Sequence, residues 1–449
     1  MSLKRGLIYT FLAQAPTLLL FFVTSTLMTR MLGDEGRGEY ALITNQVALL
    51  TLLLSLNLNY GISYFGSRTG QLRDVVGVAV ALFLVNVVLA PLLLALLWAV
   101  PATNSVLMPA RADHWLYWGY VYLAILLSLL ANCTIAVLLS MKRFRELNQL
   151  SIFSAAINAV GFVVLYMLRD RIAPGDLLAA TLIVTLTAQV LHMALAGILY
   201  AIHVGLPPLP IWSIRAARPI IAFSLVAHLS NLINLITYRF DVWVVDQYHG
   251  TASLGLYAVA AGIAQLLFYV PEPLSRVVQP YLFGPSDPSV VPRFKAVARI
   301  NFTLVLVLAG ALGLTAPWVV TLLYGDVFAG SVMALWLLLP GIVANCSFKL
   351  LAQLVVQGKL QRFNLIGAAI GAGLTIALDL ALIPRFGIAG AAVASTLAYT
   401  AVLCVTLFAI RYRMGLSLSG FFLVTFADLR QLIKLQIFHP HGTDAREGR

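Results

Sequence analysis

The chain is poor in charge. Only 10% of its 449 residues are charged and 61% are hydrophobic, whereas a soluble globular domain carries about 25% charged residues. This scarcity excludes a soluble domain, because such a domain needs far more polar surface to stay in water. Apolar runs of roughly 20 residues, the length that a helix needs to cross a bilayer, recur along nearly the whole sequence. We therefore expect an all-α polytopic membrane protein.

Cysteines and long hydrophilic segments are scarce as well. The three cysteines, Cys133, Cys346 and Cys404, each fall within an expected membrane helix, which argues against a disulfide framework or a metal cluster. The expected loops are short, so no soluble catalytic domain is inserted between helices, and no nucleotide-binding motif is present. These absences predict a protein that is not an enzyme and uses neither cofactor nor metal. Any energy would come from an ion gradient or a substrate gradient.

The net charge of +12 reflects how the chain is oriented in the membrane. Most of the Lys and Arg residues fall in every second loop and in the C-terminal tail. Loops on the cytoplasmic side of a membrane carry such an excess of basic residues, so we place both termini in the cytoplasm. Basic charge distributed in this way argues against a nucleic-acid partner.

About twelve membrane helices account for the apolar runs. They are expected near residues 7–29, 40–63, 75–99, 116–139, 150–168, 177–202, 218–238, 254–281, 300–323, 329–356, 364–383 and 387–410. The chain is thereby divided into a six-helix lobe at 1–204, a Pro-rich cytoplasmic linker at 205–218, a second six-helix lobe at 219–411, and an interfacial helix with a disordered tail at 412–449.

The two halves of the chain repeat a short motif. Residues 33–41 read GDEGRGEYA and residues 250–258 read GTASLGLYA. The identical positions, all at one constant separation along the chain, are Gly33 and Gly250, Gly38 and Gly255, Tyr40 and Tyr257, and Ala41 and Ala258. Two later pairs of loops match at almost the same separation. Three matches at a nearly constant separation indicate a duplication.

The repeat unit holds six helices, an even number, so both copies enter the membrane in the same orientation. Parallel repeats of this kind are related by a pseudo-two-fold axis along the membrane normal. We therefore expect two similar lobes with a cleft between them. This architecture suits alternating access, in which rocking of the lobes exposes the cleft to each side of the membrane in turn.

The repeated motif and its surroundings resemble one family. The first copy follows the first expected helix, and the second follows Arg239-Phe240-Asp241 near the end of the seventh. Together with the two lobes, these features resemble the prokaryotic polysaccharide-transport proteins. These are flippases of lipid-linked oligosaccharides within the multidrug/oligosaccharidyl-lipid/polysaccharide exporter superfamily. The resemblance extends to about Arg411 and is strongest from Phe240 to Tyr281.

The resemblance implies a MATE-like fold with a central cavity. It also implies that the protein moves an undecaprenyl-pyrophosphate-linked oligosaccharide from the inner to the outer leaflet of the bacterial inner membrane, for O-antigen, capsule or exopolysaccharide biosynthesis. The implied partners are this lipid-linked oligosaccharide, the lipid bilayer and the polysaccharide polymerase machinery.

One acidic residue lies deep in an expected membrane helix. Glu272 is about ten residues, or ~15 Å at 1.5 Å per residue, from the cytoplasmic end of the eighth helix, where an ionisable group costs roughly 2.5–3.5 kcal/mol. Pro271 and Pro273 remove helical hydrogen bonds beside it, and an interrupted helix at the midplane is typical of a transporter binding site. Glu272 therefore either serves substrate binding or coupling, or pairs with Arg276 one turn along a kinked helix.

Two basic residues remain in the membrane helices once the loops are assigned. Arg276 and Lys349 both fall toward the cytoplasmic halves of their helices, where a substrate loading from the inner leaflet would meet them. We expect them to bind the pyrophosphate, Arg276 through its planar guanidinium and Lys349 as a point charge. The alternative for Arg276 is that its long side chain reaches the interface.

Further polar residues are assigned by position. Asp241 and Asp379 fall near the outer ends of the seventh and eleventh helices. Each is an interfacial anchor or ion-pair partner, or couples transport to protons or sodium. Asn57, Asn231 and Asn234 either form hydrogen bonds between helices or face the sugar hydroxyls of the substrate.

Two other functions fit parts of this pattern. A cation-coupled multidrug antiporter of the same superfamily would need acidic residues within the first lobe, and the expected helices one to six contain none. A membrane glycan polymerase or ligase would need a long outer loop with clustered Arg, His or acidic residues, and the outer loops are short. The leading hypothesis is therefore the flippase.

Overall fold

The computed structural model describes residues 3–67, 72–100, 115–141, 143–205, 208–282 and 290–424, which are helical nearly throughout and contain no β-strand. The helices are α1 Leu3–Ser55, α2 Leu58–Gly66, α3 Leu72–Ala99, α5 Trp115–Ser140, α6 Phe144–Leu168, α7 Leu177–His203, α8 Ile214–Gln265, α9 Pro271–Leu282, α10 Val290–Tyr324, α11 Ser331–Gln357 and α12 Gln361–Phe408. Nine helical stretches in these ranges are long and apolar enough to cross a membrane. A polytopic all-α membrane protein is thereby confirmed.

Three of the helices are interrupted by a glycine. Helices α1, α8 and α12 contain 53, 52 and 48 residues, which is more than twice the roughly 20 residues that one crossing needs. The backbone leaves the helical conformation at Gly33 (φ 67°), Gly250 (φ 78°) and Gly387 (φ 55°). Each of these helices is thus long enough for two crossings. The count of twelve crossings stays a prediction.

The loops expected around two of these glycines are helical instead. The sequence predicts loops at residues 30–39 and 239–253, yet these residues continue α1 and α8 apart from Gly33 and Gly250. Glycine adopts positive φ at little steric cost, so a single residue redirects the chain where a longer loop is expected. Residues on either side of each glycine therefore belong to long helices and not to loops, which changes the setting of several polar side chains.

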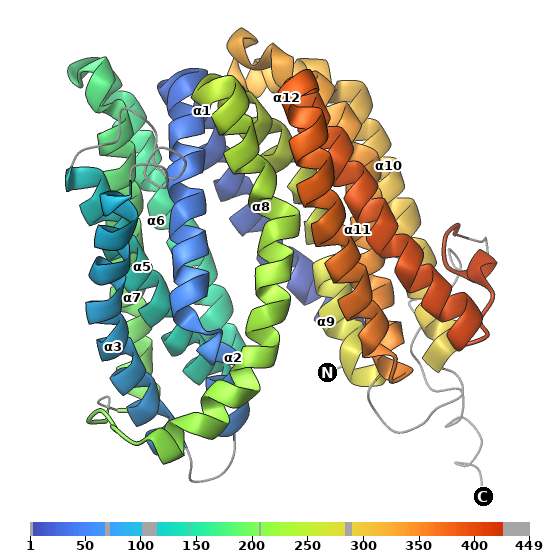
Figure 1. The fold of residues 1–449 in the computed structure, drawn as a ribbon, viewed down its shortest axis with the longest axis horizontal. Helices are drawn as coiled ribbons and strands as arrows, with labels where there is room; N and C mark the ends of the chain where they lie inside the picture. Colours follow the sequence, from blue (N-terminus) through green and yellow to red (C-terminus); the bar gives the residue numbers. More distant parts are fainter. Residues whose placement is uncertain are drawn as a thin grey trace, which may run out of the picture.

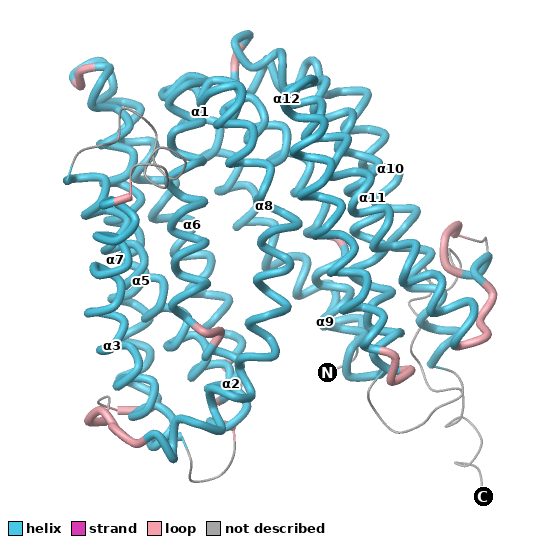
Figure 2. The backbone as a smooth tube through the Cα atoms, in the orientation of Figure 1, coloured by secondary structure: helices cyan, strands magenta, loops and turns pink. Residues whose placement is uncertain are grey.

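The helices form two groups, which we call the first lobe (α1 to α7) and the second lobe (α8 to α12). Figure 1 shows α3, α5, α6 and α7 together on one side and α10, α11 and α12 on the other, with α1 and α8 between them. Figure 2 shows the short connections between the helices. Among the described residues, one large apolar cluster packs mainly α8 to α12, and three smaller ones pack mainly α1 to α7. The two-lobe arrangement matches the expectation, and its exact boundaries stay predictions.

The first helix of each lobe also contacts the opposite lobe. Oγ of Ser224 in α8 accepts a hydrogen bond from the backbone N–H of Gly61 in α2 at 3.1 Å. In the other direction, Nε of Arg30 in α1 donates to the carbonyl of Leu323 in α10 at 2.8 Å. Because each lobe holds the other through such contacts, a rocking movement of the lobes would have to rearrange them.

A further helix break occurs at a similar place in both lobes. In the first lobe, α1 and α2 are separated by Leu56 and Asn57, whose φ angles are 44° and 55°. In the second lobe, a short 3-10 turn at Leu266–Tyr269 separates α8 from α9. The predicted interruption is present, directly before Pro271, which is the first residue of α9. The expected loss of helical hydrogen bonds at Pro271 is wrong, because proline at the first position of a helix loses none.

The two segments that flank the second lobe are described in part. Helix α8 begins at Ile214 with Ser213 as its N-cap, so residues 214–218 of the expected linker are helical. After α12, Phe421 is buried against α10. The interfacial helix and tail expected at 412–449 lie mostly outside the described residues, which end at 424.

Candidate functional site

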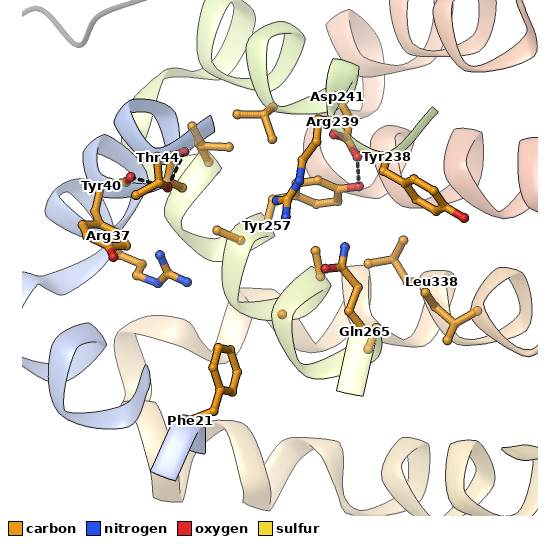
Figure 3. A pocket seen from close by; sticks show the side chains of 18 of the residues that line it. Phe21, Arg37, Tyr40, Thr44, Tyr238, Arg239, Asp241, Tyr257, Gln265 and Leu338 are labelled. Carbon is orange, nitrogen blue, oxygen red and sulfur yellow. Dashed lines mark hydrogen bonds between the residues drawn. The ribbon is translucent and has the colours of Figure 1, made fainter. Parts of the chain in front are cut away.

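A cavity of about 210 Å³ lies between α1 of the first lobe and α8, α11 and α12 of the second. Figure 3 shows Arg37 and Arg239 directed into it from opposite sides. Tyr40 and Tyr257, which are equivalent positions of the repeat, both line it. Their presence places the cavity at the junction of the two repeats.

Arg37 is a candidate that sequence reasoning missed. Its guanidinium lies 5.7 Å from the centre of the Tyr40 ring. Its Nε is buried and has no hydrogen-bond partner among the described residues. The sequence predicts an outer loop here, whereas the residue lies within α1. Its place inside the repeated motif GDEGRGEYA is the signal that could have found it.

Two buried carboxylates belong to the second lobe, and one of them, Asp241, also lines the cavity between the lobes. Asp241 of α8 is 5% exposed and accepts a hydrogen bond from the Tyr257 hydroxyl (Figure 3). Asp379 of α12 is 0% exposed, and neither carboxylate oxygen has a hydrogen-bond partner among the described residues. The two carboxylates act on each other electrostatically, and the buried hydroxyls of Thr375 and Ser395 belong to α12 as well. Asp241 also interacts electrostatically with Arg239, whereas Asp379 has no such basic partner in the described part of the chain. Because burying an unpaired carboxylate is costly, the pair is suited to hold a proton or a cation at Asp379.

The structure corrects the position of these acids. The sequence predicts them near the outer ends of their helices. However, α8 continues to its break at Gly250 and the first part of α12 to Gly387. At 1.5 Å per residue, Asp241 and Asp379 lie about 14 Å and about 12 Å before these breaks. Their burial, at 5% and 0% exposed, does not fit the predicted role of interfacial anchors, which have to reach water.

Lys349 of α11 and Glu272 of α9 form an ion pair. Nζ of Lys349 lies 3.3 Å from Oε1 of Glu272 and 3.9 Å from the centre of the Phe268 ring, a cation–π contact. The two side chains are 27% and 44% exposed. The structure thus brings together two residues that the sequence singles out separately, at the break between α8 and α9, and leaves both within reach of a ligand.

Arg276 belongs to α9 by its backbone, but its side chain lies outside the described part of the chain. The predicted alternative, a pair between Glu272 and Arg276, therefore stays a prediction. The partner that the structure gives to Glu272 is Lys349.

The three predicted sugar-facing asparagines lie in different settings. Asn57 is buried at the break between α1 and α2 and lines a cavity of about 390 Å³ inside the first lobe. Asn231 and Asn234 lie on α8, half-buried and exposed, and line neither this cavity nor the one between the lobes. Of the three asparagines, Asn57 therefore lines a cavity, and that cavity lies inside the first lobe.

One acid of the first lobe also needs correction. The sequence predicts Glu39 in a loop, and the expected first-lobe helices then contain no acid. In the structure Glu39 lies on α1 and is 5% exposed, close enough to Tyr117 of α5 to interact electrostatically. The argument against an antiporter from missing first-lobe acids is therefore wrong.

Two helical lobes with a cavity at their junction define the fold of this polytopic membrane protein. Solved structures of this fold include the lipid II flippase MurJ in an inward closed conformation, with a TM-score of 0.73, 14% identity, and coverage of 97% of this chain and 94% of that chain. An inward-facing multidrug resistance MATE family transporter of the MOP superfamily has a TM-score of 0.66 at 14% identity, covering 88% and 94%. A MOP superfamily transporter from Pyrococcus furiosus Vc1 has a TM-score of 0.61 at 14% identity, covering 92% and 96%. The MATE-like fold is confirmed.

The family follows from the sequence comparison. A family model described as polysaccharide biosynthesis protein matches residues 3–284, and this chain belongs to that family. No curated protein sequence matches the chain. The predicted family resemblance is confirmed.

Proposed function

We propose that this protein is a flippase that moves an undecaprenyl-pyrophosphate-linked oligosaccharide from the inner to the outer leaflet of the bacterial inner membrane by alternating access. The observation that carries the proposal is the part-exposed ion pair of Lys349 and Glu272 in a chain of a polysaccharide biosynthesis family. A pyrophosphate can replace the carboxylate as the partner of Lys349, because both accept hydrogen bonds from an ammonium group.

The exchange of partners gives each charged residue a role. Lys349, joined by Arg276, binds the pyrophosphate when substrate enters from the inner leaflet. Glu272 returns to Lys349 when the substrate leaves, so the empty protein carries no isolated lysine charge at this position. Glu272 replaces the interaction that Lys349 loses when the pyrophosphate departs, so this return favours release of the substrate.

The buried acids supply a coupling site in this proposal. Asp241 and Asp379 hold a proton or a sodium ion, which compensates two carboxylates that repel each other. Binding of the ion in one conformation and its release in the other would link the ion gradient to the movement of the lobes. The coupling site lies in the same lobe as Lys349, so both ligands act on the second lobe.

The remaining features of the proposal concern the cell. Both termini face the cytoplasm, and the flippase works beside polysaccharide polymerase machinery on an O-antigen, capsule or exopolysaccharide pathway. The excess of basic residues in every second loop supports this orientation.

The experiment is a flipping assay in proteoliposomes with a fluorescent undecaprenyl-pyrophosphate-linked oligosaccharide. We expect Lys349→Ala to lower the initial rate at least tenfold, and Glu272→Gln to lower it as well. Lys295→Ala is the matched control, because Lys295 also stacks on a phenylalanine ring, Phe421, at 5.2 Å. Unchanged rates for both Lys349→Ala and Glu272→Gln would overturn the assigned site.

A cation-coupled multidrug antiporter is the second candidate, and the buried Glu39 is the observation that favours it. The two functions are separated by their substrates. An antiporter would expel cationic drugs from loaded vesicles, with a rate that falls in Glu39→Gln, and would leave the lipid-linked oligosaccharide where it is.

A further inference from the structure

The cavity inside the first lobe has a lining that is polar and uncharged. Its volume is about 390 Å³, within the roughly 300–1,000 Å³ typical of ligand pockets. Eleven of the fourteen lining residues carry a hydroxyl or an amide, and none carries a charge. They are Tyr40, Thr44, Thr51, Ser55, Asn57, Asn59, Tyr120, Ser128, Asn132, Thr185 and Gln189.

The repeat relates this cavity to the ion pair of the second lobe. The ends of equivalent helices keep the separation of the repeated motif: α5 ends at 140 and α11 at 357, and α6 begins at 144 and α12 at 361. The same separation makes Ser55 the counterpart of Glu272 and Asn132 the counterpart of Lys349. Ser55 and Asn132 both line the first-lobe cavity. Where the second lobe has an ion pair, the first lobe therefore has a hydroxyl and an amide.

Several polar groups of this cavity have no partner within the protein. Nδ2 of Asn57, Oγ1 of Thr51 and Oε1 of Gln189 are buried, and no hydrogen bond is made to them by the described residues. Asn57 and Thr51 are 6% and 9% exposed. Leaving a buried donor or acceptor unpaired costs free energy, so a ligand that supplies both donors and acceptors would stabilise these side chains once they turn toward the cavity.

We propose that this cavity is a subsite for neutral sugar residues of the lipid-linked glycan, separate from the pyrophosphate site at Lys349. The proposal rests on the proposed flippase function. A pyrophosphate would need cations in the lining, and an apolar drug would leave the unpaired amides unpaired. Sugar hydroxyls both donate and accept, as amides and hydroxyls do. The two lobes would thus divide the substrate, charge in the second and sugar in the first.

The test measures binding of two kinds of lipid to the protein in nanodiscs. One is undecaprenyl pyrophosphate without sugar. The other is the same lipid bearing one sugar, which is glucose, galactose or N-acetylglucosamine. The measured quantity is the dissociation constant of the bare lipid divided by that of each sugar-bearing lipid. A loss of affinity that affects both lipids equally cancels in this ratio. We expect the wild-type protein to bind at least one sugar-bearing lipid more tightly than the bare lipid. Asn132→Leu and Gln189→Leu are each expected to lower this preference about three- to tenfold, the effect of one lost hydrogen bond.

The chain offers a matched pair for control. Thr185 lines the cavity, whereas Thr187 lies on the exposed face of the same helix, and each hydroxyl donates to the carbonyl four residues earlier. Thr185→Val changes little volume and is expected to lower the preference for the sugar-bearing lipid, and Thr187→Val is expected to keep it. This pair decides the question even where a leucine variant fails to fold.

Each outcome separates the subsite from the flippase. A wild-type protein that flips the oligosaccharide lipid but binds bare and sugar-bearing lipids equally would overturn the subsite and leave the function standing. A preference that Thr185→Val, Asn132→Leu and Gln189→Leu all leave unchanged would overturn it too. A wild-type protein that neither binds nor flips any of these lipids would overturn the proposed function and the subsite with it.

Discussion

Gly38 of α1 and Gly255 of α8 lie against each other's helices in a reciprocal contact. A Cβ atom on Gly38 would lie 1.7 Å from the carbonyl oxygen of Thr251, and one on Gly255 would lie 1.9 Å from that of Asp34. The two contacts are equivalent, because Gly38 and Gly255 are counterparts in the repeat and so are Asp34 and Thr251. The pseudo-two-fold relation that the repeat predicts is therefore visible at this close approach of the two lobes.

This contact predicts that Gly38→Ala prevents the lobes from closing at the inter-lobe cavity. The added methyl has backbone, not a flexible side chain, in its way, so the two helices have to separate. We expect a lower flipping rate and faster labelling of Thr44→Cys, a cavity residue, by a membrane-impermeant thiol reagent added outside. Gly119→Ala is the control, because open space surrounds that glycine. Equal labelling in the Gly38 and Gly119 variants would contradict the prediction.

The two helix breaks predict a different effect at Gly33 and Gly250. Both have almost the same backbone conformation, with φ 67° and ψ −170°, and φ 78° and ψ 172°, a region that costs a residue with a side chain about 1–3 kcal/mol. Apart from the adjoining backbone, no atom of the described residues lies within 4 Å of either Cβ position, so the cost is in the backbone alone. We expect Gly33→Ala and Gly250→Ala each to lower the melting temperature in detergent. Gly262→Ala, in a helix with open space, is expected to keep or raise it.

The ion pair predicts opposite effects on binding and turnover. Glu272→Gln removes the carboxylate that competes with pyrophosphate for Lys349. We expect this variant to bind undecaprenyl pyrophosphate several-fold more tightly, yet to flip its substrate more slowly because release is no longer assisted. Isothermal titration with the bare lipid and the flipping assay measure the two quantities. Weaker binding by Glu272→Gln would show that the carboxylate organises the site and does not compete for the lysine.

The buried acids predict a gain of stability at the expense of coupling. Asp379→Asn removes a fully buried carboxylate that has no hydrogen-bond partner among the described residues, so we expect a higher melting temperature. We also expect flipping in Asp379→Asn and Asp241→Asn to lose its response to an imposed gradient. Separate proton and sodium gradients identify the ion. Asp170→Asn, at an exposed position, is the control, and a full response in all three variants would exclude the coupling site.

Much of the architecture follows from the sequence alone. Low charge and recurring apolar runs of about 20 residues determine a polytopic helical membrane protein, because a helix of that length crosses the bilayer and satisfies its own backbone groups in lipid. The spacing of GDEGRGEYA and GTASLGLYA predicts the equivalence of α1 and α8, and the closely similar conformations of Gly33 and Gly250 agree with it. Composition and the internal repeat are properties of the linear sequence, so they can be recognised without knowing which helices contact one another.

Only the tertiary structure decided which polar residues meet. Lys349 and Glu272 are 77 residues apart, and their pairing depends on how α11 packs against the break between α8 and α9. Single-glycine breaks replace the expected loops, so that Asp241, expected at a helix end, and Glu39, expected in a loop, are buried in long helices. A sequence pattern reports the face and the period of one helix, whereas contacts between helices depend on the packing of all of them. For that reason the charged site of the second lobe and the neutral cavity of the first became visible only in the folded chain.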